Sequence, residues 1–319
     1  MAQFDLFNSQ LAPKGVATLL KTPLLENDRV DFASYVRQVE HVVDVGTCLA
    51  IPGMRGCETW TLSEAERIRC LELTLEICSG RVPVCAAVAA ISIPDSITVA
   101  QRAEEMGADM IAVVIPPWIR RDVDIVSCVK AVADSVSIPN LVHSVGGAGD
   151  LVLSTQQLAK LPAESPNIRY LKEEAPLGAV ERVSEVLSLP GGEGYLRIMV
   201  GSPLVLGYLA GARMFMASAD VVEPFMAVIN AMEAGDIAKA RRIDTHIAAL
   251  QHFRGYIKGQ FNNKVIMQRC GIFTSARCAS VRSEVGLTEL TPDEEDELTE
   301  LLRPLMPYYN TKYSPTPPA

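Results

Sequence analysis

At the centre of the 319-residue sequence lies the stretch Asn167-Ile168-Arg169-Tyr170-Leu171-Lys172-Glu173-Glu174. It predicts a short strand that ends near a lysine, and because side chains alternate along a strand, Ile168, Tyr170 and Lys172 should share one face. If that face lines the inside of a barrel, burial favours the neutral amine over the ammonium. A neutral amine can attack a carbonyl group and form a Schiff base. The alternative is a solvated lysine at a strand end, since lysine is rarely buried.

Short apolar segments alternate with amphipathic segments on both sides of this stretch. The expected strands cover residues 15–20, 48–51, 84–88, 110–115, 140–143, 167–174, 196–200 and 213–217. The expected helices cover 32–45, 96–106, 123–136, 154–161, 177–187 and 204–210, with two more that begin at 63 and near 224. Eight strand–helix units with short connections predict a parallel sheet, and strands without a polar face favour a closed barrel over an open sheet. We therefore predict an α/β fold, a (β/α)₈ TIM barrel, over residues 1–236.

The pattern changes after residue 236, where helical segments follow one another without strands. Residues 237–256 and 261–271 predict helices, and Thr291-Pro292-Asp293-Glu294 is a typical capped start of a last helix. Residues 237–309 are therefore expected to form a C-terminal helical extension, whose usual role on a barrel is packing or contact between subunits. The polar, proline-rich residues 310–319 are expected to be disordered.

Composition and charge exclude several classes of function. The net charge of −9 argues against a nucleic-acid partner and against docking on an anionic membrane. Residues 1–15 contain Asp5 and no continuous apolar core, so no signal peptide is expected, and no apolar run is long enough to span a membrane.

The cysteines indicate a reduced, cytoplasmic protein. None of them forms a Cys-x-x-Cys pair, and most lie in apolar segments, which argues against a disulfide framework or a zinc site. No metal-ligand spacing, nucleotide-binding loop or flavin signature is present, so we expect neither a metal nor a cofactor. The eight are Cys48, Cys57, Cys70, Cys78, Cys85, Cys128, Cys270 and Cys278.

Reactive groups gather at one end of the predicted barrel. In such barrels the active site lies at the C-terminal ends of the strands. Lys172, His143 and the loop after the second strand all fall at that end.

Several stretches carry a resemblance to a known family. They are residues 15–23, closed by Thr22-Pro23; the loop of residues 53–63; the lysine strand of residues 167–174; and Val200-Gly201-Ser202 with the helical segment 291–302. From Gly15 to Pro304 the chain resembles the dihydrodipicolinate synthase and N-acetylneuraminate lyase superfamily of Schiff-base lyases.

This resemblance implies a (β/α)₈ barrel that assembles as a homo-oligomer, a tetramer or a dimer. It also implies that the lysine forms an imine with a small 2-oxo acid such as pyruvate. The protonated imine acts as an electron sink, so that the neighbouring carbon can lose a proton, and the resulting enamine adds to an aldehyde. Lys172 takes the place of the imine-forming lysine.

Two departures from the family pattern concern the reaction itself. His143 stands where the family has a proton-relaying tyrosine, and an imidazole can also take and give a proton near neutral pH. Arg55 lies in the loop that carries the family's threonine pair. Its guanidinium could bind a carboxylate. This would replace an arginine of the family, whose position aligns with Ala148 in this sequence. The pair aligns with Arg55 and Gly56 or with Met54 and Arg55. The alternatives are a packed polar histidine and a surface arginine.

The remaining candidates are expected to contact substrate without reacting. The backbone of Gly56, Cys57, Glu58 and Thr59 could hold a carboxylate, although Glu58 could instead brace the loop. Trp118 lies in Pro116-Pro117-Trp118. A tryptophan at this position resembles the hydratase-aldolase branch of the family and would stack on a flat substrate. The alternative for Trp118 is a core or subunit contact. Ser202 and Ala217, near the ends of the seventh and eighth strands, complete the set.

We therefore expect a Schiff-base lyase of the aldolase or hydratase-aldolase type, which makes or breaks a carbon–carbon bond between a 2-oxo acid and an aldehyde. Dihydrodipicolinate synthesis itself is not expected, because the tyrosine, the threonines and the arginine are all replaced. One alternative is a dehydratase that acts on a sugar-acid-like 2-oxo acid through the same imine. The other is a barrel that binds a metabolite without catalysis.

Overall fold

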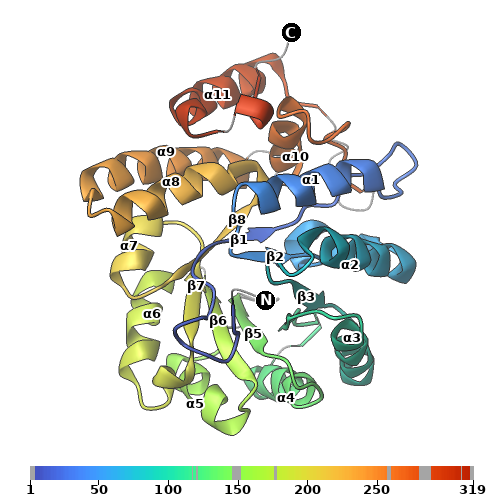
Figure 1. Cartoon of the computed structure of the whole chain (residues 1–319), viewed down its shortest axis with the longest axis vertical. Coiled ribbons are helices and arrows are strands. Elements are labelled where there is room, and N and C mark those ends of the chain that lie inside the picture. Colours follow the sequence, from blue (N-terminus) through green and yellow to red (C-terminus); the bar gives the residue numbers. More distant parts are fainter. Residues whose placement is uncertain are drawn as a thin grey trace.

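The computed structural model describes residues 4–116, 118–119, 121–145, 152–175, 178–256, 260–279, 289–309 and 311–316. Its strands are β1 (Gly15–Leu19), β2 (Leu49–Ile51), β3 (Cys85–Val88), β4 (Met110–Val113), β5 (Asn140–Val145), β6 (Ile168–Glu174), β7 (Arg197–Val200) and β8 (Met214–Ser218). They pair in parallel in the order β2-β1-β8-β7-β6-β5-β4-β3 (Figure 1). A bridge between Ala50 and Val84 joins the two edges. The predicted (β/α)₈ barrel is confirmed.

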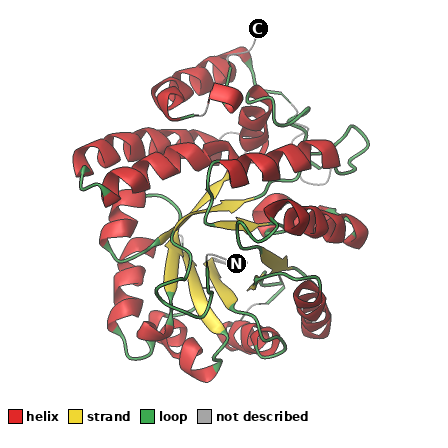
Figure 2. Cartoon of the chain, in the orientation of Figure 1, coloured by secondary structure: helices red, strands yellow, loops and turns green. Residues whose placement is uncertain are grey.

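Helices surround the strands as an outer layer (Figure 2). Each strand is followed by one of them, which is why the strands can all run in the same direction. They are α1 (Phe32–Asp44), α2 (Glu64–Cys78), α3 (Ile93–Glu105), α4 (Asp122–Ala133), α5 (Thr155–Glu164), α6 (Ala179–Ser188), α7 (Leu204–Leu209) and α8 (Val222–Glu233).

The inside of the barrel is filled by its own apolar cluster, to which Leu49, Met110, Leu141 and Tyr170 belong. The N-terminal segment closes one end of this cluster, because the Tyr170 hydroxyl donates to the carbonyl oxygen of Leu6 at 3.0 Å. Arg197, the first residue of β7, donates to the carbonyl oxygens of Ser9 and Ala12 at 2.8 and 3.0 Å. The segment therefore covers the N-terminal ends of the strands and leaves the C-terminal ends accessible.

One prediction about the lysine strand is wrong. Ile168 packs in the outer cluster with Leu171, whereas Tyr170 packs inside the barrel. The reason is a shift in the pairing of β5 and β6, in which Asn140 pairs with Ile168 but Leu141 pairs with Tyr170. Such an irregularity interrupts the alternation of side chains.

Two helices extend beyond their predicted boundaries and include a proline. Helix α3 begins at Ile93 rather than at residue 96, with Pro94 in the first turn, where no backbone donor is needed. Helix α5 continues beyond Pro162 to Glu164. Proline cannot donate to the carbonyl oxygen of Leu158, and the hydroxyl of Tyr195 donates to that oxygen instead, at 2.7 Å.

The extension consists of α9 (Ile237–Tyr256), α10 (Gln260–Arg269) and α11 (Pro292–Leu302). In Figure 1, α9 lies along α8, and α10 and α11 lie on the side of the barrel formed by α1. Residues 311–316 contain a short 3₁₀ turn, and Thr316 donates from its backbone to the carbonyl oxygen of Arg269 at 3.2 Å. The expectation of a disordered tail over residues 310–319 stays a prediction, and residues 310 and 317–319 lie outside the described residues. None of the helices in the described ranges combines the length and apolar composition that a membrane span requires.

Candidate active site

A cavity of about 580 Å³ opens at the C-terminal ends of the strands. The ends of β1, β5, β6, β7 and β8 contribute to it, together with the loop after β2 and parts of α9 and α10. Six of the residues predicted from the sequence line this cavity, namely Lys172, His143, Arg55, Gly56, Ser202 and Ala217.

Lys172 lies inside the barrel near the end of β6, with 4% of its surface exposed. Its partner across the sheet is His143 of β5. This pairing brings the Lys172 Nζ to 3.2 Å from the His143 Nε2. The strand register therefore explains why the amine and the imidazole meet.

Glu174 is a third member of this group that the sequence analysis did not identify. Its Oε2 contacts the Lys172 Nζ and lies 2.8 Å from the His143 Nε2. Lys172 and Glu174 are two residues apart on one strand and therefore share a face. That spacing was the available sequence signal. The intervening Glu173 points to the other side, where it pairs with the Nε of Arg182 at 3.2 Å.

The charges in this group determine its protonation. Burial lowers the pKa of His143 to about 4, with a further contribution from the positive charge of Lys172, although the bond to Glu174 opposes the shift. Desolvation alone would raise the pKa of Glu174, but the charge of Lys172 and the hydrogen bond from His143 hold it well below its usual range. Near neutral pH the imidazole is therefore neutral and Glu174 is a carboxylate. The Nε2 hydrogen of His143 then points to Glu174, and this nitrogen cannot also accept from Lys172.

The loop after β2 forms two short turns, η1 (Arg55–Cys57) and η2 (Thr59–Thr61), which meet at Glu58 in the left-handed region with φ of 59°. The first turn brings Arg55 and Gly56 to the cavity, next to Met54. All three residues of the two alternative alignments thus line it.

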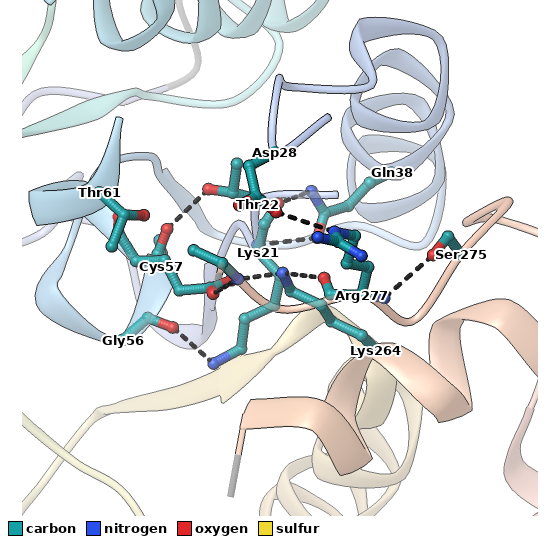
Figure 3. Close-up of polar contacts among 12 residues, drawn as sticks. Lys21, Thr22, Asp28, Gln38, Gly56, Cys57, Thr61, Lys264, Ser275 and Arg277 are labelled. Carbon is teal, nitrogen blue, oxygen red and sulfur yellow. Dashed lines mark hydrogen bonds and ion pairs between the residues drawn. The ribbon is translucent and has the colours of Figure 1, made fainter. Parts of the chain in front are cut away.

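The rest of this loop is held by the scaffold rather than exposed to the cavity. The carbonyl oxygen of Cys57 accepts from the hydroxyl of Thr22 at 2.7 Å (Figure 3), and burial raises the pKa of the Cys57 thiol to about 11. Glu58 contacts the Nζ of Lys264 in α10. Cys57, Glu58 and Thr59 are buried and are not among the residues that line the cavity, so their contact with substrate stays a prediction.

The C-terminal extension supplies one wall of the cavity. Arg254 of α9 donates to the Ser218 Oγ at 2.9 Å and lies 3.2 Å from the Asp220 Oδ2. Asn263 of α10 donates to the same hydroxyl at 2.8 Å. Gln251 of α9 also lines the cavity. We expected packing or subunit contact from this extension, and the structure shows that it also shapes the site.

Comparison with known proteins agrees with this geometry. Residues 12–303 match the Dihydrodipicolinate synthetase family. The chain belongs to the dihydrodipicolinate synthetase family.

Two relatives show how similar this sequence is to other sequences of the family. The 4-hydroxy-tetrahydrodipicolinate synthase of Hyphomonas neptunium is 31% identical over 241 residues, which cover 74% of this chain and 81% of the relative. That of Thermodesulfovibrio yellowstonii is 28% identical over 298 residues, which cover 91% of this chain and 97% of the relative. The family consists of class I lyases and synthases, and this member is an imine-forming enzyme of the aldolase type.

Solved structures of this family share the fold. The dihydrodipicolinate synthase from Aquifex aeolicus superposes with a TM-score of 0.79 at 23% identity, covering 93% of this chain and 100% of that chain. The one from Thermotoga maritima gives a TM-score of 0.80 at 19% identity, covering 91% and 98%.

Trp118, selected for its likeness to the hydratase-aldolase branch of this family, lies outside the group of residues that line the cavity. It is 51% exposed, and its indole nitrogen donates to the carbonyl oxygen of Ile91 at 2.8 Å. A stacking role therefore stays a prediction. Pro117 and Ala148, which entered the comparison with the family, lie outside the described residues.

Proposed function

We propose that this enzyme makes or breaks a carbon–carbon bond between a 2-oxo acid such as pyruvate and an aldehyde, through an imine on Lys172. The observation that carries the proposal is the contact group at the barrel mouth, in which the Lys172 Nζ lies 3.2 Å from the His143 Nε2 and against the Glu174 carboxylate. Within this group a proton donor, a proton acceptor and a nucleophile face one cavity.

Imine formation needs a proton acceptor beside the lysine. Lys172 passes a proton to Glu174, and its amine attacks C2 of the oxo acid. The carbonyl oxygen leaves as water with one amine proton and the proton held by Glu174, so that the iminium keeps the positive charge and the carboxylate is restored. Since the iminium is the electron sink, the reaction requires no metal or organic cofactor.

Carbon–carbon bond formation then needs a base and an aldehyde. The pair formed by His143 and Glu174 takes a proton from C3, and the enamine attacks the aldehyde carbon. That carbonyl oxygen becomes a hydroxyl with the same proton, and water releases the product from Lys172. The lowered pKa of Glu174 supports this role, because the carboxylate can accept the proton while the neutral imidazole of His143 donates its Nε2 hydrogen to it.

Arg55 is the proposed partner of the carboxylate next to the imine. It lines the cavity beside Gly56, and a guanidinium can bind both oxygens of a carboxylate. Replacement of Arg55 with alanine should raise the Michaelis constant for the oxo acid, by about tenfold or more. An unchanged Michaelis constant would show that Arg55 does not bind the carboxylate.

A second candidate is a dehydratase that acts on a sugar-acid-like 2-oxo acid. The wall formed by Ser218, Gln251, Arg254 and Asn263 favours it, because hydroxyl, amide and guanidinium groups suit a hydroxylated substrate better than an aromatic one. The same imine would then expel a hydroxyl group instead of adding an aldehyde.

Borohydride trapping tests the shared step. The enzyme is incubated with pyruvate and borohydride, its intact mass is measured, and the adduct is mapped by peptide digestion. We expect the mass gain of one reduced imine on Lys172, and none for Lys172→Arg. No adduct with any 2-oxo acid would refute the proposal. Product analysis with a panel of aldehydes and with single sugar acids then separates aldol addition from dehydration.

A further inference from the structure

A second cavity, of about 80 Å³, lies between α2 and α3, behind the loop that follows β2. Most of its lining is apolar and includes Leu20, Leu62, Leu71, Ala86 and Ala103. Glu64 and Arg102 also line it and form an ion pair at 3.3 Å, with side chains 68% and 51% exposed. This pair therefore marks the side of the cavity that faces solvent.

The lining also contains a cation without an ion-pair partner. The Glu64 carboxylate is paired with Arg102, and no acidic side chain of the described ranges forms an ion pair with Arg67. The Nη1 of Arg67 donates to the carbonyl oxygen of Ala89 at 2.7 Å, whereas its Nε is buried and has no hydrogen-bond partner in those ranges. The charge of the lining therefore favours an anion.

A second buried polar group of the lining, the Thr59 hydroxyl, also lacks a hydrogen-bond partner in the part of the chain that the structure describes. Thr59 lies in η2 of the loop after β2 and is 1% exposed. Buried polar groups are seldom left unpaired. Since a hydroxyl and a guanidinium Nε can both donate to a carboxylate oxygen, Thr59 and Arg67 suit the same kind of ligand group.

The size of this cavity limits its ligand. A cavity of roughly 150 Å³ holds benzene and a single water needs about 10–15 Å³, so this cavity suits a molecule of about three to five non-hydrogen atoms. The apolar lining favours an aliphatic chain over further polar groups.

This cavity shares a wall with the substrate cavity. Met54, Arg55 and Gly56 of the loop after β2 line the substrate cavity, whereas Gly53 and Thr59 on either side of them line the second one. The segment after β1 is divided in the same way. Its residues Leu19 and Lys21 line the substrate cavity, and Leu20 and Thr22 line the second one. The hydrogen bond from Thr22 to the Cys57 carbonyl joins the two segments (Figure 3).

We propose that the second cavity binds a small aliphatic carboxylate such as propionate, with its chain between α2 and α3 and its carboxylate at Arg67 and Thr59. Because the shared loop carries Arg55 and Gly56, binding there changes the affinity of the substrate cavity for the 2-oxo acid. Only this coupling rests on the proposed function.

Binding is tested by titration with propionate, followed by ligand-detected NMR, and with propionamide, which has the same shape and no charge. Propionate should bind with a dissociation constant on the order of 1 mM. In Arg67→Met this constant should rise by about 10- to 100-fold, and propionamide should bind the wild type correspondingly weakly. Ala103→Leu fills the cavity and should abolish binding. Arg69→Met, at an exposed arginine of the same helix, is the matched control and should bind like the wild type.

Three results would overturn the inference. They are equal binding by Arg67→Met and the wild type, binding retained in Ala103→Leu, and a loss of binding in Arg55→Ala, which would place propionate in the substrate cavity. Thermal unfolding shows whether each variant is folded, and Ala103→Val replaces Ala103→Leu if the larger side chain prevents folding.

The coupling is tested by borohydride trapping of pyruvate on Lys172. Saturating propionate should change the pyruvate concentration for half-maximal adduct by about fivefold or more in the wild type and leave it unchanged in Arg67→Met. An unchanged concentration in the wild type would overturn the coupling. If pyruvate forms no adduct, the proposed function fails, and the NMR titration decides the carboxylate site separately.

Discussion

Lys172, His143 and Glu174 act as one unit because a single carboxylate oxygen contacts both nitrogen atoms. The sequence suggested an amine in a partly apolar place. The structure instead places a negative charge beside the amine. In the proposed mechanism this charge accepts the proton that the ammonium must lose before it can attack a carbonyl. The side chain of Glu174 is 46% exposed, so this carboxylate can exchange protons with solvent.

The first prediction concerns Glu174→Gln, which keeps the shape and removes the charge. Imine formation with pyruvate should slow by about 10- to 100-fold or more, because the lysine loses its nearest proton acceptor. Quenching with borohydride at timed intervals measures this rate. Glu164→Gln, on the exposed side of α5, is the matched control and should react like the wild type. Wild-type kinetics in Glu174→Gln would show that the proton leaves by another route.

At the scale of elements, contacts between segments decide where helices end and how the site is enclosed. Helix α5 tolerates Pro162 because Tyr195 supplies the hydrogen bond that proline cannot. The loop after β2 is joined to α10 by the contact between Glu58 and Lys264, whose side chains are both 1% exposed. A buried ion pair of this kind links one side of the cavity to the extension and leaves a costly charge if either partner is lost.

The second prediction concerns Tyr195→Phe. It leaves the carbonyl oxygen of Leu158 without this donor, and the free energy of unfolding should fall by about 1–3 kcal/mol. Urea denaturation at constant pH measures the difference. Tyr208→Phe provides the comparison, because that hydroxyl meets Glu233 at an exposed site, at 2.9 Å, and its loss should change stability by less than about 0.5 kcal/mol. Equal losses in both variants would contradict the role given to Tyr195.

At the scale of the whole molecule, buried histidines couple stability to pH. His41 of α1 is buried, and its Nε2 lies 3.7 Å from the Glu223 Oε2. Burial lowers the pKa of His41 to about 4, as it does for His143. The unfolded chain, in contrast, takes up protons on histidine near the ordinary pKa of about 6.5.

The third prediction follows from the sign of this difference. Between pH 6.5 and pH 4 the unfolded state binds more protons than the folded state, so stability is full above this window and falls as the pH drops through it. Each histidine can account for about 3 kcal/mol across the window. Thermal unfolding measured at intervals of pH shows the slope. His41→Gln should have a shallower slope than the wild type, and an identical slope would contradict the assignment.

Local sequence determined the architecture of this protein and the place of its proposed nucleophile, Lys172. Apolar strands, amphipathic helices and capping residues such as Ser63 and Thr291 are encoded by neighbouring residues, so eight strand–helix units and Lys172 near a strand end could be predicted. The place of His143 near the end of β5 could be predicted for the same reason, since a strand end is defined by the residues around it.

Tertiary structure alone decided what surrounds that nucleophile. The pairing register set Lys172 beside His143, and the closed ring of strands brought Lys21 to the same cavity. Three further features could not be predicted from the sequence pattern. They are the cavity wall formed by α9 and α10, the hydrogen bond from the Tyr195 hydroxyl to α5, and the packing of residues 311–316. These contacts join residues far apart in the chain, and their strength depends on burial and charge, which no local periodicity records.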